Sequence, residues 1–564
     1  MNLPEIGIRV ACIAHVALAA ITAVAQQSPA PPTSIAEFQE KPVMVQLKDG
    51  TLAGYFVRTE TDKQIVTVRT SGDLGDTWSE ESPVLEMSTE PGYYNLPEAL
   101  VDRDGEVHLF FINAARTVQA SGGEENRPKT GDWRDSRLDI WHARSRDGRT
   151  RWEAPKKVWE GYTGALNSVI QMDSGRILLP FSCLTKRTWA NRGDGLAAFT
   201  FYGQFDSTLI YSDDGGDTWT WPDVRLKVPT PDIVAAYGSV EPVVIQLKDG
   251  RVWMLIRTQQ GRFYESFSND GATWSDPMPS AIVSSDSPAG IVRLTDGRLV
   301  LFWNNCQRYP YAYGGRQVLH AAISDDDGAH WQGYREVARD PLRNEPPPPG
   351  GDHGTAYPFP FPLNDGRCVF VTGQGYGRVL CKVVDPAWLL EKQQREDFST
   401  GLENWSVFGT KGVELTEDPQ RSGARVLSIR KVEKGWPACA VWNFPANSKG
   451  ALTIRLRAKP NFQNLTAGIT DHFSAPFDYE DRFNNLFTIN LGPIELSQDK
   501  AHTLEFRWDC LKRTCDVSVD GAVLATLPQT RWSLTPCYLR LRSETEDTND
   551  GGVEILEVSV DTAS

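Results

Sequence analysis

Polar side chains stand at the start of several short apolar runs that lie far apart in the sequence. Each run leads into an Asp-Gly or Ser-Gly pair, and the polar residues lie just before the run or within it. Carboxylates, a histidine and a tyrosine are among them, and such groups transfer protons in enzymes. If the fold brings these positions together, they form a polar pocket, which is the default site hypothesis. They are Glu40 with Lys41, Asn95 with Glu98, Asn167, Glu241, Ser287, and His353 with Tyr357.

The pairs that follow the apolar runs indicate which elements position these residues. Asp-Gly between two β-rich runs is a strong hairpin signal, because a type I′ turn needs a positive φ at both central residues. The run before each pair is therefore expected to be an inner strand, and the run after it the next strand. The pairs are Asp49-Gly50, Asp104-Gly105, Ser174-Gly175, Asp249-Gly250, Asp296-Gly297 and Asp365-Gly366.

A second motif, Ser-x-Asp followed by glycine and then tryptophan, recurs between these hairpins. It occurs at 71–78, 145–152, 212–219, 268–274 and 324–331, and it alternates with the hairpins along the chain. Repeats at this period are typical of propellers, solenoids or arrays. Six hairpins with five intervening motifs predict an all-β fold, a closed six-bladed β-propeller over residues 36–392.

The Ser-x-Asp motif itself has two interpretations. Serine and aspartate side chains can bond nearby backbone N–H groups, and glycine admits a positive φ, so the motif can be a structural turn. Asp and Gly also suit a calcium loop, but the regular ladder of oxygen ligands ending in Glu is absent. We expect a structural turn whose tryptophan packs between neighbouring blades.

The pattern changes near residue 395. Residues 395–564 contain alternating strands and no further Ser-x-Asp motif, which suggests a β-sandwich resembling concanavalin-like jelly rolls or carbohydrate-binding modules. Trp405, Trp436 and Trp508 could either stack on sugar rings or form the core of this sandwich. The pairs Cys510–Cys515 and Cys368–Cys381 could form disulfides, or remain buried thiols.

The Ser-x-Asp turns on a six-bladed propeller resemble the Asp-box (BNR) repeats of the sialidase, or neuraminidase, superfamily. The segment "GSVEPVVIQLKDGRVWMLIRT" is similar to the sialidase segment in which a glutamate precedes an inner strand and an arginine ends the next. Glu241 and Arg257 occupy those two positions. Arg316 precedes the fifth motif as the family's last carboxylate-binding arginine does, and "GTAYPFPFPLNDGR" resembles the segment of the nucleophilic tyrosine, which gives Tyr357.

The resemblance implies the chemistry of a retaining glycoside hydrolase. Tyr357 attacks the anomeric carbon and Glu241 takes its proton. The stretch "RTETDKQIVTVRTS" lies where the family keeps its acid/base aspartate, which gives Asp62, with Glu60 as the second candidate. This group protonates the leaving oxygen and then activates water. Arginines at the two positions named above would bind a substrate carboxylate in bidentate fashion.

One position departs from the family. Sialidases carry their first arginine in a Phe/Tyr-Arg-Ile-Pro motif, whereas the matching stretch here is "FQEKP", with Glu40 in the arginine's place. Lys41 supplies a positive charge without the fork geometry of a guanidinium, and Arg58 could also reach inward. Together with His353 and Asn167 at the mouth, this departure suggests a remodelled pocket.

The N-terminus and the composition bear on location and partners. Residues 1–25 have the apolar run and small-residue cleavage site of a signal peptide, and 26–35 resemble a linker, so a secreted or periplasmic protein is expected. The apolar run is short for a spanning helix. A net charge of −15 argues against a nucleic-acid partner. No CxxC pair has zinc-site spacing, so no metal or cofactor is expected.

These patterns favour an exported monomeric exo-glycosidase, similar to exo-α-sialidases, that removes a terminal acidic sugar from a glycan. Two alternatives stay open. A polysaccharide lyase on a similar propeller would use His353 and a tyrosine to abstract a proton from a uronic acid, and a non-catalytic propeller would only bind glycan.

Overall fold

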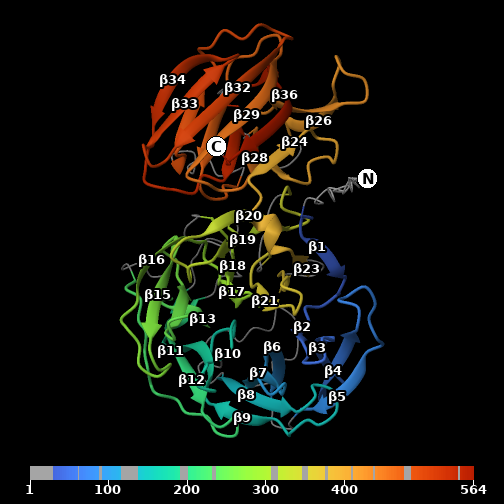
Figure 1. Cartoon of the computed structure of the whole chain (residues 1–564), viewed down its shortest axis with the longest axis vertical. Helices are drawn as coiled ribbons and strands as arrows, with labels where there is room; N and C mark the ends of the chain where they lie inside the picture. Colours follow the sequence, from blue (N-terminus) through green and yellow to red (C-terminus); the bar gives the residue numbers. More distant parts are fainter. Residues whose placement is uncertain are drawn as a thin grey trace, which may run out of the picture.

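The computed structural model contains two lobes, a propeller and a β-sandwich, joined end to end (Figure 1). It describes residues 29–60, 63–87, 92–115, 137–190, 201–230, 237–306, 315–345, 353–374, 379–407, 411–435, 438–475, 484–543 and 547–563. The expected signal peptide lies outside these ranges. No helix within them is long and apolar enough to cross a membrane.

Six antiparallel sheets form the propeller, as the hairpin count predicts, and the inner strands of most adjacent blades contact one another around the axis. In each blade the first strand is innermost and leads into the expected two-residue turn. The blades are β2 (Val43–Gln46), β3 (Leu52–Thr59), β4 (Gln64–Ser71) and β5 (Ser82–Glu86); β6 (Tyr93–Val101), β7 (Val107–Ala115), β8 (Arg137–Ser145) and β9 (Lys156–Trp159); β10 (Ile170–Gln171), β11 (Ile177–Ala190) and β12 (Phe201–Ser212); β13 (Val240–Gln246), β14 (Val252–Arg257), β15 (Arg262–Ser268) and β16 (Met278–Val283); β17 (Gly290–Arg293), β18 (Leu299–Trp303), β19 (Val318–Ser324) and β20 (Gln332–Arg339); and β21 (Phe359–Pro362), β22 (Cys368–Thr372) and β23 (Leu380–Val384).

An N-terminal strand completes the sixth blade. β1 (Thr33–Ala36) pairs antiparallel with β23, so the blade combines the two ends of the propeller segment. Three residues of the stretch expected to be linker therefore take part in the sheet. Pairing the first strand with the last blade removes the free edges that an open ring would leave.

The Ser-x-Asp motifs are structural turns that follow the third strand of their blades. In the third blade Ser212 Oγ accepts from the backbone N–H of Gly216 at 2.8 Å, and Asp214 accepts from the N–H and hydroxyl of Thr218 at 2.8 and 2.6 Å. Both Asp214 carboxylate oxygens are thus used within the turn. Trp219 packs edge-on against Phe110 of the preceding blade, with ring centroids 5.5 Å apart. This confirms the expected packing between blades.

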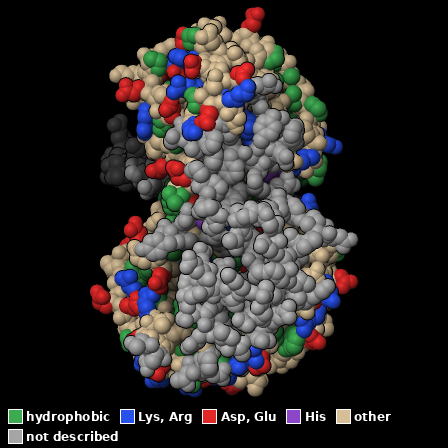
Figure 2. All heavy atoms as spheres, turned by 180° about the vertical axis from the view of Figure 1, so that it is seen from behind, with side chains coloured by type: hydrophobic (Ala, Val, Ile, Leu, Met, Phe, Trp, Pro, Cys, Tyr) green, Lys and Arg blue, Asp and Glu red, His purple; other side chains and the backbone are tan. Residues whose placement is uncertain are grey.

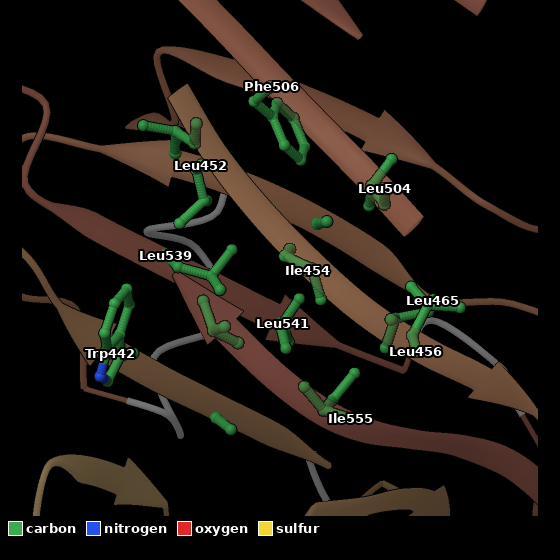
Figure 3. Packing of buried hydrophobic residues seen from close by; sticks show 14 of the residues in the cluster. Trp442, Leu452, Ile454, Leu456, Leu465, Leu504, Phe506, Leu539, Leu541 and Ile555 are labelled. Atoms are coloured by element: carbon green, nitrogen blue, oxygen red, sulfur yellow. The ribbon is translucent and has the colours of Figure 1, made fainter. Parts of the chain in front are cut away.

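The C-terminal lobe is a sandwich of two antiparallel sheets over one apolar core (Figure 3). The short helix α1 (Pro386–Leu389) connects it to the propeller. One sheet contains β26 (Val413–Glu417), β27 (Arg425–Lys431), β36 (Asn549–Asp561), β29 (Lys449–Ala458), β32 (Ala501–Asp509), β33 (Thr514–Val519) and β34 (Ala522–Pro528), with β24 (Gln393–Glu396) beside β36; the other contains β25 (Trp405–Val407), β28 (Cys439–Asn443), β35 (Tyr538–Arg542), β30 (Thr466–Thr470) and β31 (Phe487–Asn490).

Two of the three tryptophans considered for sugar stacking are core residues. Trp405 is fully buried and Trp508 is 3% exposed, so neither presents a ring to a glycan. Trp436 lies outside the described residues. Cys510 and Cys515, like Cys368 and Cys381, are free buried thiols, so the two possible disulfides are not formed.

Polar contacts join the two lobes closely. Phe473 of the sandwich donates its backbone N–H to the carbonyl of Asn305 at 2.7 Å, and the Asn305 amide donates to the carbonyl of Asp471 at 2.9 Å. Tyr538 donates its hydroxyl to Glu336 on β20 at 2.7 Å, in a fully buried position. On the face shown in Figure 2, the acidic and basic side chains of the described residues lie interspersed on both lobes.

Candidate active site

The fourth blade positions a glutamate and an arginine side by side. Val240 pairs with Arg257 across the β13–β14 hairpin, so Glu241 stands one residue along from the position opposite Arg257. A bulge between Val240 and Val243 interrupts the ladder there and turns Glu241 out of the regular alternation. Arg257 Nη1 donates a hydrogen bond to Glu241 Oε2, and both side chains are about nine-tenths buried.

Tyr357, just before the inner strand of the sixth blade, completes a three-residue cluster. Its hydroxyl donates to Glu241 Oε1 at 2.6 Å and accepts from Arg257 Nη1 at 3.0 Å. Burial raises the pKa of Tyr357 above its ordinary value, and the negative charge of Glu241 raises it further. The phenol is therefore neutral at rest, with a carboxylate placed to accept its proton.

Backbone conformation distinguishes the same two residues. Glu241 has φ +50° and Tyr357 has φ +58°, backbone angles that residues other than glycine rarely adopt. Each residue immediately precedes a proline, which further restricts its backbone. Strained conformations of this kind persist where the surrounding structure holds them and cluster at functional sites.

Arg257 makes two more contacts that the sequence did not predict. Its Nε donates to Asp286 Oδ1 at 2.9 Å, and its Nη2 donates to the hydroxyl of Tyr237 at 2.8 Å. Tyr237 in turn donates its hydroxyl to Asp286. Burial acts to lower the pKa of Arg257, but the charges of Asp286 and Glu241 prevail and raise it well above its usual value.

Arg316 lies over the ring of Tyr357. It is 2% exposed, and its guanidinium carbon lies 5.6 Å from the centre of the Tyr357 ring. Nη2 donates to the backbone carbonyl of Asp286 at 2.7 Å, and Nη1 donates to Gln374 at 2.6 Å. The structure thus brings together Glu241, Arg257, Arg316 and Tyr357, as the sequence predicted.

The backbone next to His353 lies close to the backbone of Arg316. It is buried and precedes Gly354, whose backbone approaches the Arg316 carbonyl so closely that a Cβ there would lie 2.2 Å from that oxygen. Only glycine fits this approach, since its φ is +103° as well. A role of His353 in substrate binding stays a prediction.

Neither of the two basic residues considered as substitutes for the first arginine acts as a clamp. Lys41 Nζ donates to the backbone carbonyl of Tyr357 at 2.6 Å and lies 4.4 Å from the centre of the Phe359 ring. It therefore holds the segment of the tyrosine in place. Arg58 is ion-paired with Glu40 at 2.5 Å and with Glu81 at 2.6 Å near the surface, so these carboxylates occupy its guanidinium.

The acid/base position falls at the edge of the described residues. Asp62 lies outside them. Glu60, the second candidate, is exposed and lies 3.9 Å from Lys63 across the β3–β4 turn. That turn follows β3, the second strand of the first blade. Arg257 stands at the matching end of β14, the second strand of the fourth blade.

Asn167 is a buried residue beside the inner strands of the propeller. It lines a cavity of about 740 Å³ between the inner strands, together with Glu98 and Phe359, and among the described residues the walls do not include Tyr357 or Glu241. Asn167 is 3% exposed, and within the described part of the chain neither amide atom has a hydrogen-bond partner. The role of Asn167 in substrate binding stays a prediction.

Glu98 is a half-buried acid that lines the same cavity, and its charge state should affect stability. Burial raises its pKa to about 8, although Lys41 and the backbone N–H of Ala99 oppose the shift. The folded pKa exceeds the ordinary value, so the stability contributed by the protonated acid is present below that ordinary value. It is lost as the pH rises through the folded value.

We therefore expect Glu98→Gln to match the wild type in free energy of unfolding near pH ~4.5. At about pH 9 the variant should be more stable by on the order of 3 kcal/mol. Urea denaturation of both proteins across this pH range measures the difference in their free energies of unfolding. Lys41 is unchanged in the variant. Glu86→Gln, at an exposed glutamate on β5, is the control and should follow the wild type. Parallel curves for Glu98→Gln and the wild type would contradict the assignment.

Two residues of the site were missed, although a signal for them existed. Asp286 lies four residues before β17 begins at Gly290, beside Ser287, which the sequence did single out. Tyr237 stands three residues before β13. Both follow the rule that polar residues before inner strands lie near the axis. This rule was applied to Ser287 and Glu241 and not to Asp286 and Tyr237.

The family comparison agrees with the repeats. The family model described as a BNR repeat-like domain matches residues 49–369. Curated relatives include a sialidase of Paraclostridium sordellii, 23% identical over 311 residues, and one of Micromonospora viridifaciens, 25% identical over 293 residues. The matches cover 51% and 47% of this chain and 65% and 40% of those proteins, so the chain spans under two thirds of each relative.

Solved structures that match this chain include sialidases. A Hadza microbial sialidase is 15% identical, with a TM-score of 0.43 over 63% of this chain and 68% of its own. Trypanosoma rangeli sialidase in complex with 2,3-difluorosialic acid is 13% identical, with a TM-score of 0.41 over 93% of this chain and 91% of its own. The family match over more than half of the chain shows that this protein belongs to the family with a BNR repeat-like domain and, with it, to the sialidase superfamily.

Proposed function

We propose that the protein is a retaining exo-glycosidase in which Tyr357 is the nucleophile and Glu241 accepts its proton. The observation that carries this proposal is the 2.6 Å hydrogen bond from the Tyr357 hydroxyl to Glu241 Oε1. A neutral phenol becomes a nucleophile when a neighbouring base takes its proton during attack. The Glu241 carboxylate already accepts a hydrogen bond from this proton. Arg257 donates a hydrogen bond to the phenol oxygen, on which negative charge develops as the proton leaves.

The second half of the proposed reaction needs an acid that becomes a base. We assign this role to Asp62, which follows β3 of the first blade in the sequence. It would protonate the leaving oxygen when Tyr357 attacks, and then activate the water that releases the sugar. Two displacements at the same carbon give net retention of configuration.

The proposed enzyme is exported, and its proposed target is a terminal acidic sugar on a glycan. Arg316 supports it, because a guanidinium beside the nucleophile can bind an anionic group. The signal-peptide pattern of residues 1–25 supports export. The described C-terminal sandwich buries Trp405 and Trp508, so any glycan contact it makes would use other residues.

Product analysis tests the reaction class. The purified protein is incubated with glycoside and uronic polysaccharide substrates, and the first-formed product is followed by NMR and mass spectrometry. We expect a hydrolysed sugar whose anomeric configuration matches that of the substrate. An unsaturated sugar absorbing in the ultraviolet would indicate a lyase, and binding without products would indicate a lectin. Either result would refute the proposal.

A further inference from the structure

The guanidinium that would bind a substrate carboxylate is already engaged with protein groups. Arg257 donates from Nε to Asp286, from Nη1 to Glu241 and Tyr357, and from Nη2 to Tyr237. A bidentate clamp needs two parallel N–H groups on one edge of the guanidinium. Here Asp286 takes Nε, while the Tyr237 hydroxyl takes Nη2 and donates to the same carboxylate.

Asp286 is held in this position from several sides. Its side chain is 9% exposed, and its backbone carbonyl accepts from Arg316 Nη2 at 2.7 Å. The neighbouring Ser285 and Ser287 hydroxyls contact each other at 3.0 Å, and Ser287 donates to Asn304. The carboxylate is therefore part of a fixed network before any substrate arrives.

The charges of the described cluster balance. Arg257 and Arg316 contribute two positive charges, and Glu241 and Asp286 contribute two negative charges within the same contacts. At the place of the family's first arginine stands Glu40, which is paired with Arg58. A second carboxylate brought to Arg257 would either lie against Asp286 or leave Asp286 buried without its partner, and both are unfavourable.

We propose that the terminal sugar is an aldose, with hydrogen and not a carboxylate on its anomeric carbon, and that Asp286 determines this specificity. This inference rests on the proposed glycosidase function. Asp286 lies where the anomeric carboxylate of a 2-keto acid sugar would meet Arg257, so the protein supplies that negative charge itself. The acidic group of an acidic substrate is then a uronate at the far side of the ring.

The reaction keeps its balance with such a substrate. The Tyr357 oxygen forms a bond to the anomeric carbon as the glycosidic C–O bond breaks, and the bonding pair goes to the leaving oxygen. Glu241 takes the phenol proton, and the acid/base group protonates the leaving oxygen. Water then replaces tyrosine at the same carbon, and the phenol recovers its proton from Glu241.

Substrate preference gives the first test. The probes are 4-methylumbelliferyl α-N-acetylneuraminide and the corresponding glycosides of neutral aldoses and of glucuronic acid. We expect Tyr357-dependent hydrolysis of at least one aldoside, with a kcat/KM at least about a hundredfold above that of the sialoside. If the sialoside is the preferred substrate, the aldose inference is overturned while the glycosidase proposal stands. If no glycoside is hydrolysed, the glycosidase proposal fails.

Binding of a sugar with an anomeric carboxylate tests the proposed role of Asp286 without requiring turnover. N-acetylneuraminic acid is titrated by calorimetry into the wild type, Asp286→Asn and Asp286→Ser. We expect affinity to rise by at least about tenfold in both variants, because the guanidinium loses its internal carboxylate. Asp249→Asn removes an exposed carboxylate that pairs with Arg251, and it should bind as the wild type does.

The outcomes of this titration are decisive in both directions. Wild-type affinity equal to that of a folded Asp286 variant would show that Asp286 does not exclude the anomeric carboxylate, and would overturn the inference. Circular dichroism checks that each variant is folded, and the serine variant serves if asparagine disturbs the contact with Tyr237.

Discussion

Replacing Tyr357 by phenylalanine is expected to lower kcat for glycoside hydrolysis by at least about a thousandfold. The substitution removes one oxygen, the atom that bonds to Glu241 and Arg257, and keeps the ring that lies beside Arg316. Without this oxygen no glycosyl–enzyme intermediate can form. Because the ring remains, the fold should be retained, and circular dichroism with steady-state kinetics on the preferred aldoside measures both.

The matched control is a tyrosine away from the axis. Tyr211→Phe changes a β12 residue whose ring lies 4.0 Å from the guanidinium carbon of Arg176 at the blade rim. It should leave kcat within about twofold of the wild type. Full activity in a folded Tyr357→Phe variant would exclude this residue as the nucleophile.

The second large effect is expected at the base. Glu241→Gln keeps the length of the side chain and can still accept the hydrogen bond from Tyr357, but an amide cannot take the proton. We expect kcat to fall by about a hundredfold to ten-thousandfold, the range typical of a lost general base, with KM changed much less. Stopped-assay kinetics over the same substrates as for the tyrosine variant provide the measurement.

A glutamate in the same blade controls for the loss of a buried charge. Glu265 on β15 accepts a hydrogen bond from the Trp253 indole at 3.0 Å and does not touch the tyrosine cluster. Glu265→Gln should leave kcat near the wild-type value. Equal losses in the two glutamine variants would mean that Glu241 acts through blade stability and not as a base.

The blade count and order could be read from the sequence because both signals act locally. An Asp-Gly turn and a Ser-x-Asp turn each satisfy their own backbone groups within a few residues, as the contacts of Asp214 illustrate. Their alternation then fixes the number of blades. The contribution of β1 to the sixth blade could not be read in this way, because pairing with β23 is a long-range event without a turn between the two strands.

The candidate site was predictable where register decides it. Glu241 and Arg257 follow from a single hairpin, since the turn at Asp249-Gly250 sets which residues face each other. Arg58 was considered as an inward-reaching cation, because the sequence fixes its position on β3 but not the direction of its side chain. In the structure Arg58 pairs with Glu40 and Glu81.

Asp286 illustrates a different limit of the sequence. Its importance depends on a contact with an arginine 29 residues earlier and in the adjacent blade, through side chains whose orientation no local pattern specifies. The burial of Trp405 and Trp508 could not be read from the sequence either. Alternation predicts the strands of the sandwich, but it does not distinguish a core aromatic residue from a surface one.

The most direct test of a tyrosine nucleophile is to trap the intermediate. The protein is incubated with the 2-deoxy-2-fluoroglycosyl fluoride of the aldose that it hydrolyses, and then examined by intact-mass and peptide-mapping mass spectrometry. The predicted result is one added fluoroglycosyl group on the peptide that contains Tyr357, and none on the Tyr357→Phe variant. An adduct on a carboxylate side chain would contradict the account, as would hydrolysis with inversion and no adduct.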